Sequence, residues 1–199
     1  MQILIFSMLA VAAYFLGCIA SSVIIAKYFG CIDPRTSGSK NPGATNMLRV
    51  NNKYVALMTL IADLLKGMLP VLFAKMLGLD SLEILVIGMF AFVGHIYPVF
   101  YAFHGGKGVA TALGVLIGYS LQMALILVLI WLIIYFFSKI VSLASITTFI
   151  IFPFATLLFF NWPEAIVALL MALISIVAHK ANIRQLMVGT EQKTEIFNE

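Results

Sequence analysis

Apolar residues form long, nearly uninterrupted runs along this chain of 199 residues, and short polar stretches separate them. A helix needs about 20 apolar residues to cross the roughly 30 Å of hydrocarbon in a bilayer, and most of the runs reach or approach that length. The pattern predicts an all-α, polytopic membrane protein. The runs cover residues 1–27, 54–77, 83–102, 108–137, 143–160 and 164–179.

The first and fourth runs need interpretation. Residues 1–27 lack a basic leading region and are too long for a signal peptide, so we expect a first spanning helix that the mature chain keeps. Residues 108–137 would form one helix of about 45 Å, longer than a bilayer needs. The polar sequence "GYSLQ" at 118–122 could instead divide this run into a short helix and a full one.

The distribution of basic residues favours the division. Ten of the twelve lysines and arginines fall in four clusters, and such clusters tend to lie on the cytoplasmic side of a membrane. An even number of spans must then separate neighbouring clusters, so 108–137 supplies two. This predicts seven spans, with the N-terminus outside and the C-terminus cytoplasmic, whereas hydropathy alone also allows six. Lys75 falls near an outer end, where it could snorkel to the interface. The clustered residues are Lys27, Arg35, Lys40, Arg49, Lys53, Lys107, Lys139, Lys180, Arg184 and Lys193.

Composition agrees with the membrane class. Hydrophobic residues make up 63% of the chain and charged residues 10%, and the net charge of +4 reflects loop asymmetry rather than nucleic-acid binding. Cys18 and Cys31 form no disulfide framework. We expect one transmembrane domain over residues 1–199.

A polar stretch, "TSGSKNPGATNMLR", occupies residues 36–49. Asn41 followed by Pro42 predicts an N-cap and first helical residue, and the glycine-rich entry would suit an anion. The alternative is an ordinary turn and cap with a membrane-anchoring arginine. Three polar residues would share a face of the helix: Thr45, Asn46 and Arg49.

A second polar stretch is "AFHGGKGVAT", residues 102–111. Gly105, Gly106 and Gly108 would let the backbone approach a ligand and donate its N–H groups, while Lys107 adds a positive charge near a helix that begins around Val109. A Walker A loop is excluded, because Gly108 stands where Ser or Thr is required. The alternative is a flexible hairpin with a positive-inside lysine.

Two further stretches complete the set. Ser142 and Ser145 begin a membrane helix, where serines commonly serve as caps. His179 and Asn182 are three apart in "HKANIRQLMVGTE", residues 179–191, although a lone histidine is more often simply interfacial.

The predicted topology gathers these four stretches on one membrane face. Their candidate residues are basic, hydroxylated, amide or glycine, with no carboxylate among them. Such residues suit a phosphate-bearing substrate, whereas a metal site would call for acidic ligands, and no H-E-x-x-H zinc motif occurs. The pattern predicts a phosphate-handling pocket at the membrane surface that holds no metal.

Two spacings inside the apolar runs indicate packing. Asp63 and Lys66 are three apart and would form a buried ion pair, which could support the site or serve structure alone. Gly114 and Gly118 form a G-x-x-x-G pattern, which favours close helix packing.

Three segments in order, "SGSKNPGATNMLR", "GHIYPVFYAFHGGKGVAT" and "HKANIRQLMVGTE", closely resemble the signature motifs of the bacterial acyl-phosphate:glycerol-3-phosphate acyltransferases. The resemblance covers essentially the whole chain, including "DLLKG" and "VSLAS". It implies transfer of a long-chain acyl group from acyl phosphate to the 1-hydroxyl of sn-glycerol 3-phosphate. The products would be lysophosphatidic acid and phosphate, in the first acylation of phospholipid synthesis.

The resemblance also implies a setting. The enzyme would lie in the bacterial inner membrane with its active site facing the cytoplasm, need no cofactor, and depend on an enzyme that forms acyl phosphate. We expect Arg49, Lys107 and His179 to be catalytic. The general base could be His179 or a substrate phosphate, while His95 would be structural. By motif position, the substrate-binding residues would be Ser39, Thr45, Asn46, Gly105, Gly106, Gly108, Ser142 and Asn182.

The chain departs from the family pattern at three places. Lys40 replaces a usual glycine, His104 replaces a usual lysine, and Gln185 after Arg184 replaces a usual arginine. No role is assigned to Lys40, His104 or Arg184.

Other classes fit less well. An acyl-CoA-dependent acyltransferase would resemble an H-x-x-x-x-D signature, and no histidine here has an aspartate five residues on. A phosphate transporter would place its site near the bilayer midplane in repeated halves. A structural subunit would leave the four co-facing stretches unexplained.

Overall fold

The computed structural model describes residues 2–194, and this described part is built from helices with no strand. It divides into two compact units, Met1–Tyr119 and Ser120–Glu199.

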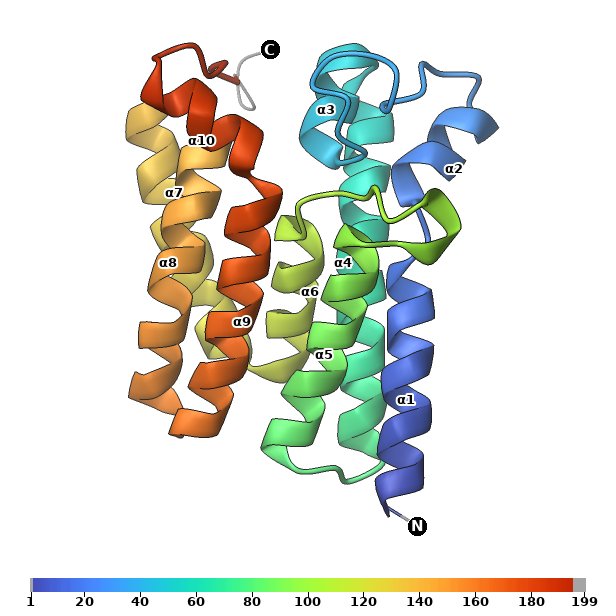
Figure 1. Cartoon of the computed structure of the whole chain (residues 1–199), viewed down its shortest axis with the longest axis vertical. Helices are drawn as coiled ribbons and strands as arrows, with labels where there is room; N and C mark the ends of the chain where they lie inside the picture. Colours follow the sequence, from blue (N-terminus) through green and yellow to red (C-terminus); the bar gives the residue numbers. More distant parts are fainter. Residues whose placement is uncertain (1, 195–199) are drawn as a thin grey trace. The chain divides into compact units, whose positions relative to one another are not determined.

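The first unit is organised around its longest helix, α4, which contacts α1, α2, α3, α5 and α6. In Figure 1, α1, α4, α5 and α6 run side by side, while α2, α3 and the segment 97–108 gather at one end of this bundle. The helices are α1 (Gln2–Gly17), α2 (Ser21–Tyr28), α3 (Ala44–Val50), α4 (Lys53–Met76), α5 (Ser81–Ile96) and α6 (Val109–Tyr119), with a 3-10 turn at Val99–Tyr101.

Glycines bring α4 and α6 into close contact. A Cβ atom at Gly67 would overlap the backbone carbonyl of Thr111, and one at Gly114 would overlap that of Leu64. A Cβ atom at Gly118 would lie 3.0 Å from the Val71 side chain. The G-x-x-x-G pattern is therefore a packing motif, as the spacing predicts, and a larger residue at Gly114 would push the two helices apart.

The first apolar run is not the single helix predicted. It breaks after Gly17 into α1 and α2, whose axes differ by 43°. At the break the carbonyl of Ile19 accepts a turn hydrogen bond from the Ser21 N–H at 3.0 Å, and the Nζ atom of Lys66 also donates to it at 2.7 Å. A buried lysine thus satisfies the backbone at the interruption, which hydropathy could not reveal.

The division of residues 108–137 is confirmed. α6 ends at Tyr119, and Ser120 caps α7 by accepting a hydrogen bond from the Met123 N–H at 3.3 Å. With 11 residues, α6 is only about 16 Å long, shorter than a bilayer core. Its last carbonyl, that of Tyr119, accepts from the Nζ atom of Lys75 at 2.6 Å, so this lysine caps a helix rather than snorkelling.

In the second unit, α8 packs against both α7 and α9. α9 and α10 meet at a 64° bend. The chain after α10 returns to the end of α7, where the Tyr135 hydroxyl donates to the carbonyl of Thr194 and the Thr194 N–H donates to that of Lys139. The helices are α7 (Leu121–Ser138), α8 (Val141–Phe159), α9 (Trp162–Ala178) and α10 (Lys180–Met187).

By length and composition, four helical segments within residues 2–194 can cross a membrane, and six can if each bent pair counts as one span. The bent pairs are α1 with α2 and α9 with α10. The count of seven and the orientation of the termini stay predictions.

We expect Gly114→Ala to destabilise the first unit more than Gly118→Ala. The added methyl at Gly114 would overlap the Leu64 carbonyl, 1.9 Å away, which cannot rotate aside. At Gly118 the nearest atoms are farther, the Val71 side chain at 3.0 Å and the Met68 carbonyl at 3.1 Å. Overpacking of this kind costs about 1–3 kcal/mol. Thermal unfolding of both variants in the same detergent checks this, and equal midpoints would contradict it.

Candidate functional site

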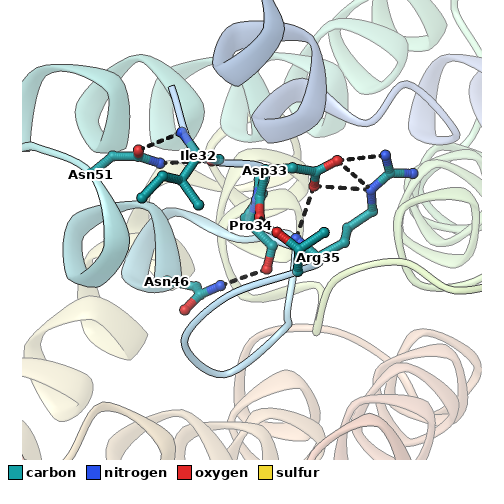
Figure 2. Close-up of polar contacts among 7 residues, drawn as sticks. Ile32, Asp33, Pro34, Arg35, Asn46 and Asn51 are labelled. Carbon is teal, nitrogen blue, oxygen red and sulfur yellow. Dashed lines mark hydrogen bonds and ion pairs between the residues drawn. The ribbon is translucent and has the colours of Figure 1, made fainter. Parts of the chain in front are cut away.

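Asn46 organises the loop that precedes α3. Its side chain is buried, with 2% exposed, and both amide hydrogens donate to loop carbonyls, at 2.8 Å to Pro34 and 3.1 Å to Ser37. Its Oδ1 atom accepts from the Ser39 N–H at 2.9 Å. Figure 2 shows the bond to Pro34. The Asn46 amide is thus committed to the loop, and its contribution in this structure is to hold the loop's shape.

A second asparagine, Asn51, which was not singled out from the sequence, holds the start of the same loop through hydrogen bonds. The Asn51 side chain accepts from the Ile32 N–H at 2.9 Å and donates to the Ile32 carbonyl at 3.0 Å (Figure 2). These two hydrogen bonds resemble those between paired β-strands, although the segment has no regular secondary structure. Asn51 lies two residues after the motif, at the C-cap of α3, so only its position beside a helix end could have indicated its role.

The short helix begins later than predicted. Asn41 and Pro42 lie outside it, because the Gly43 N–H turns back to the Asn41 carbonyl at 2.9 Å, and Gly43 becomes the N-cap of α3. Thr45 and Arg49 lie half-buried on α3, and Ser39 is exposed in the loop. The seven-residue helix ends in Arg49-Val50.

Arg35 and Asp33 connect this loop to the segment 97–108. The two side chains form an ion pair of 2.6 Å, visible in Figure 2. The guanidinium also lies over the Tyr101 ring, 5.6 Å from its centre. The hydrogen bonds from Arg35 lower the pKa of the Asp33 carboxyl below its ordinary value. The ion pair therefore stabilises the loop at pH values above the ordinary pKa of an aspartate. This stabilisation is lost as the pH falls through the lowered pKa of Asp33.

The glycine-rich loop is seated on the end of α5. The Gly105 N–H donates to the Ile96 carbonyl and the Gly106 N–H to the His95 carbonyl, both at 3.1 Å. The sequence predicts that these N–H groups face a ligand, whereas in this structure those of Gly105 and Gly106 donate to α5, which needs partners for its last carbonyls. The glycines permit close approach instead, since Cβ atoms here would overlap His95.

Gly108 requires glycine for a different reason. Its φ of +81° is unfavourable for other residues, and a Cβ atom there would overlap the Phe92 ring. α6 begins directly afterwards at Val109, as predicted. Lys107 is thus held between two tightly packed glycines, half-buried itself.

In the second unit, a carboxylate joins two of the predicted residues. The Ser142 hydroxyl and the Asn182 amide each donate to the Oε1 atom of Glu191 at 2.7 Å. Within residues 2–194, the Oε2 atom of Glu191 and the Oδ1 atom of Asn182 are buried without a hydrogen-bond partner. The expectation that no carboxylate stands among the candidates is therefore wrong, although Glu191 closes the third quoted motif.

His179 lies at the bend between α9 and α10, with 2% exposed, rather than within one helix as its spacing from Asn182 predicts. Its Nδ1 atom is 2.8 Å from the carbonyl oxygen of Ser175. A carbonyl only accepts, so in the neutral imidazole Nδ1 carries the hydrogen and Nε2 is the basic nitrogen. This geometry fixes which nitrogen can take a proton.

Comparison with known proteins adds what geometry alone does not give. A family model described as glycerol-3-phosphate acyltransferase matches residues 7–189. The chain belongs to the glycerol-3-phosphate acyltransferase family. It is 47% identical over 196 residues to the glycerol-3-phosphate acyltransferase of Neisseria meningitidis serogroup C / serotype 2a, covering 94% of this chain and 97% of that protein. The protein of the same name from Methylococcus capsulatus is 42% identical over 182 residues, covering 91% and 92%.

Solved structures show the same likeness. The chain matches the crystal structure of PlsY (YgiH), an integral membrane glycerol 3-phosphate acyltransferase, in its glycerol 3-phosphate form, with a TM-score of 0.89, 40% identity and 96% of both chains covered. The lysophosphatidic acid form of PlsY matches with a TM-score of 0.87 and 39% identity over 96% and 95%. This acyltransferase is therefore an integral membrane transferase, consistent with phospholipid synthesis.

Within this acyltransferase the predicted residues fall into two groups. Ser39, Thr45, Asn46 and Arg49 lie in the first unit with residues 105–108, whereas Ser142, His179 and Asn182 lie in the second. In the first group a hydrogen bond joins Ser39 to Asn46, and in the second Glu191 joins Ser142 to Asn182.

We expect Asn46→Asp to loosen the loop before α3 in this acyltransferase. Aspartate keeps the acceptor for Ser39 but loses the hydrogens donated to Pro34 and Ser37. Leaving such groups unpaired costs about 1–3 kcal/mol. Hydrogen exchange of a peptide over 34–40 should therefore accelerate. Asn51→Asp is the matched control, since it removes the hydrogens donated to the Ile32 carbonyl and the Met47 sulfur and leaves the bonds of Asn46 in place. Unchanged exchange in Asn46→Asp would contradict the assignment.

Proposed function

We propose that this chain transfers a long-chain acyl group from acyl phosphate to the 1-hydroxyl of sn-glycerol 3-phosphate. The hydroxyl oxygen forms an ester with the acyl carbon, the bond from that carbon to the phosphate oxygen breaks, and inorganic phosphate leaves with lysophosphatidic acid as the other product. The observation that carries the proposal is the match over 96% of the chain to PlsY, whose structures have a glycerol 3-phosphate form and a lysophosphatidic acid form. The assignment of acyl phosphate as the donor rests on the resemblance of the three motifs.

The basic residues supply what this reaction needs. An acyl phosphate is a mixed anhydride, so the leaving group is already activated, and the protein has to orient the acceptor and stabilise negative charge. Arg49 and Lys107 serve the substrate phosphates, as their charge and their places in the first two motifs indicate. The glycines around Lys107 fix the loop that carries it rather than binding phosphate through Gly105 and Gly106, whose N–H groups are engaged by α5.

Two groups can take the proton from the acceptor hydroxyl. The bond from His179 Nδ1 to the Ser175 carbonyl makes Nε2 the basic nitrogen, which suits a general base. A phosphate monoester has a second pKa of about 6, so a substrate phosphate can serve instead. Ser142 and Asn182, held by Glu191, would then act in substrate binding.

The proposed setting follows the charge distribution. The chain would act as a single acyltransferase domain over 1–199, with seven spans, an outer N-terminus and a cytoplasmic active site in a bacterial inner membrane. The acyl chain would lie among the helices at the level of the bilayer. An enzyme that forms acyl phosphate would supply the donor.

The donor assignment is tested with purified protein and sn-glycerol 3-phosphate in lipid. We expect turnover with palmitoyl phosphate, followed as phosphate and lysophosphatidic acid, and none with palmitoyl-CoA or palmitoyl acyl carrier protein. Turnover with a thioester alone would overturn the donor. No turnover with any donor would favour a transporter.

Two of the three catalytic assignments, those of Arg49 and His179, are tested by Arg49→Ala and His179→Ala. Loss of a charge that stabilises the transition state costs about 10²–10³-fold or more, so Arg49→Ala should abolish measurable turnover. His179→Ala should lower kcat by about 10²–10⁴-fold if His179 is the base, and leave substantial activity if substrate phosphate is. Lys53→Ala and Lys180→Ala, at exposed lysines, are the controls. An active Arg49→Ala variant would contradict its role.

A further inference from the structure

Three buried polar residues lie beneath the glycine-rich loop and play no part in the proposed chemistry. Asp63 is 2% exposed, Lys66 5% and His95 7%. Lys66 Nζ lies 2.9 Å from Asp63 Oδ1, so the predicted ion pair is present. His95 Nδ1 faces the same carboxylate oxygen at 3.6 Å. Burying such groups is expensive unless they are paired, so the cluster holds its members in place.

His95 contacts the loop in two ways. Its carbonyl accepts the Gly106 N–H at 3.1 Å. Its ring also faces Gly106, because a Cβ atom there would overlap the Nε2, Cε1 and Cδ2 atoms. One edge of the imidazole therefore faces Asp63 and the other edge faces the loop. The residue next to Gly106 is Lys107.

We propose that His95 is a positioning residue: anchored at Asp63, its ring sets the depth at which Gly106 seats on α5 and thereby places Lys107. This inference rests on the proposed function, in which Lys107 serves a substrate phosphate. Glycine is then required at position 106 for lack of space rather than for backbone flexibility, since a methyl group there would overlap the His95 ring.

Gly105 provides a matched comparison. A Cβ atom there would overlap the His95 carbonyl and approach the Pro98 ring and the Ile96 carbonyl, none of which belongs to the imidazole. Both glycines lie in the same loop, and each N–H is bonded to α5 at 3.1 Å. Removing the imidazole should therefore remove the overlap of a methyl group at Gly106. It should leave the overlap of a methyl group at Gly105 unchanged.

The test is a pair of double-mutant cycles read in the KM for sn-glycerol 3-phosphate and in kcat. The variants are Gly106→Ala, His95→Ala and their combination, set beside Gly105→Ala and its combination with His95→Ala. The methyl at Gly106 should lift Lys107 and raise KM. Adding His95→Ala to Gly106→Ala should lower KM again by at least about fivefold. His95→Ala should not improve Gly105→Ala. Melting temperatures of all variants report folding separately.

The outcomes separate this inference from the proposed function. Turnover by the unsubstituted protein tests the function alone, so additive KM effects in an active enzyme would overturn the role of His95 and nothing else. Coupling seen in the melting temperature but absent from KM would also overturn it, because the contact would then be packing without effect on the site. Equal recovery at Gly105 and Gly106 would overturn it as well, since a specific ring contact cannot produce that result.

Discussion

The first unit depends on the satisfaction of backbone carbonyls where its membrane helices are interrupted. The last carbonyls of an interrupted helix need hydrogen-bond partners, and the protein has to supply them wherever lipid excludes water. Lys66 donates to the carbonyl of Ile19 at the break between α1 and α2, and Lys75 donates to that of Tyr119 at the end of α6. Both lysines belong to α4, which thus connects the interrupted helices as well as packing against them.

The break at Ile19 has a consequence for the loop that carries Lys107. Lys66 Nζ pairs with Asp63 at 2.9 Å, and Asp63 in turn faces His95 at the end of α5. His95 and Ile96 then bind the two glycines that precede Lys107. One set of buried polar contacts therefore extends from a helix break to the glycines next to Lys107, the residue proposed to serve substrate phosphate.

Sequence predicts the helical class, the division of 108–137, the Gly114 contact and the Asp63–Lys66 pair, because each depends on hydropathy or on spacing within a helix. It could not predict the break at 18–20, since no proline or polar run marks it and its partner is 47 residues away. The engagement of Gly105 and Gly106 by α5 was hidden for a similar reason. Glycine next to lysine is typical both of anion loops and of tightly seated turns, and only the positions of the His95 and Ile96 carbonyls distinguish them. Glu191 escaped notice because its partners, Ser142 and Asn182, come together only in the folded unit.

The central claim is that the glycines seat the loop while Lys107 and Arg49 supply the charge. The most direct measurement is a structure of this protein with sn-glycerol 3-phosphate bound. The account predicts that the phosphate lies within hydrogen-bonding distance of the Lys107 or Arg49 side chain, while the Gly105 and Gly106 N–H groups still donate to Ile96 and His95. A phosphate bound to those two N–H groups, with the loop lifted from α5, would contradict it.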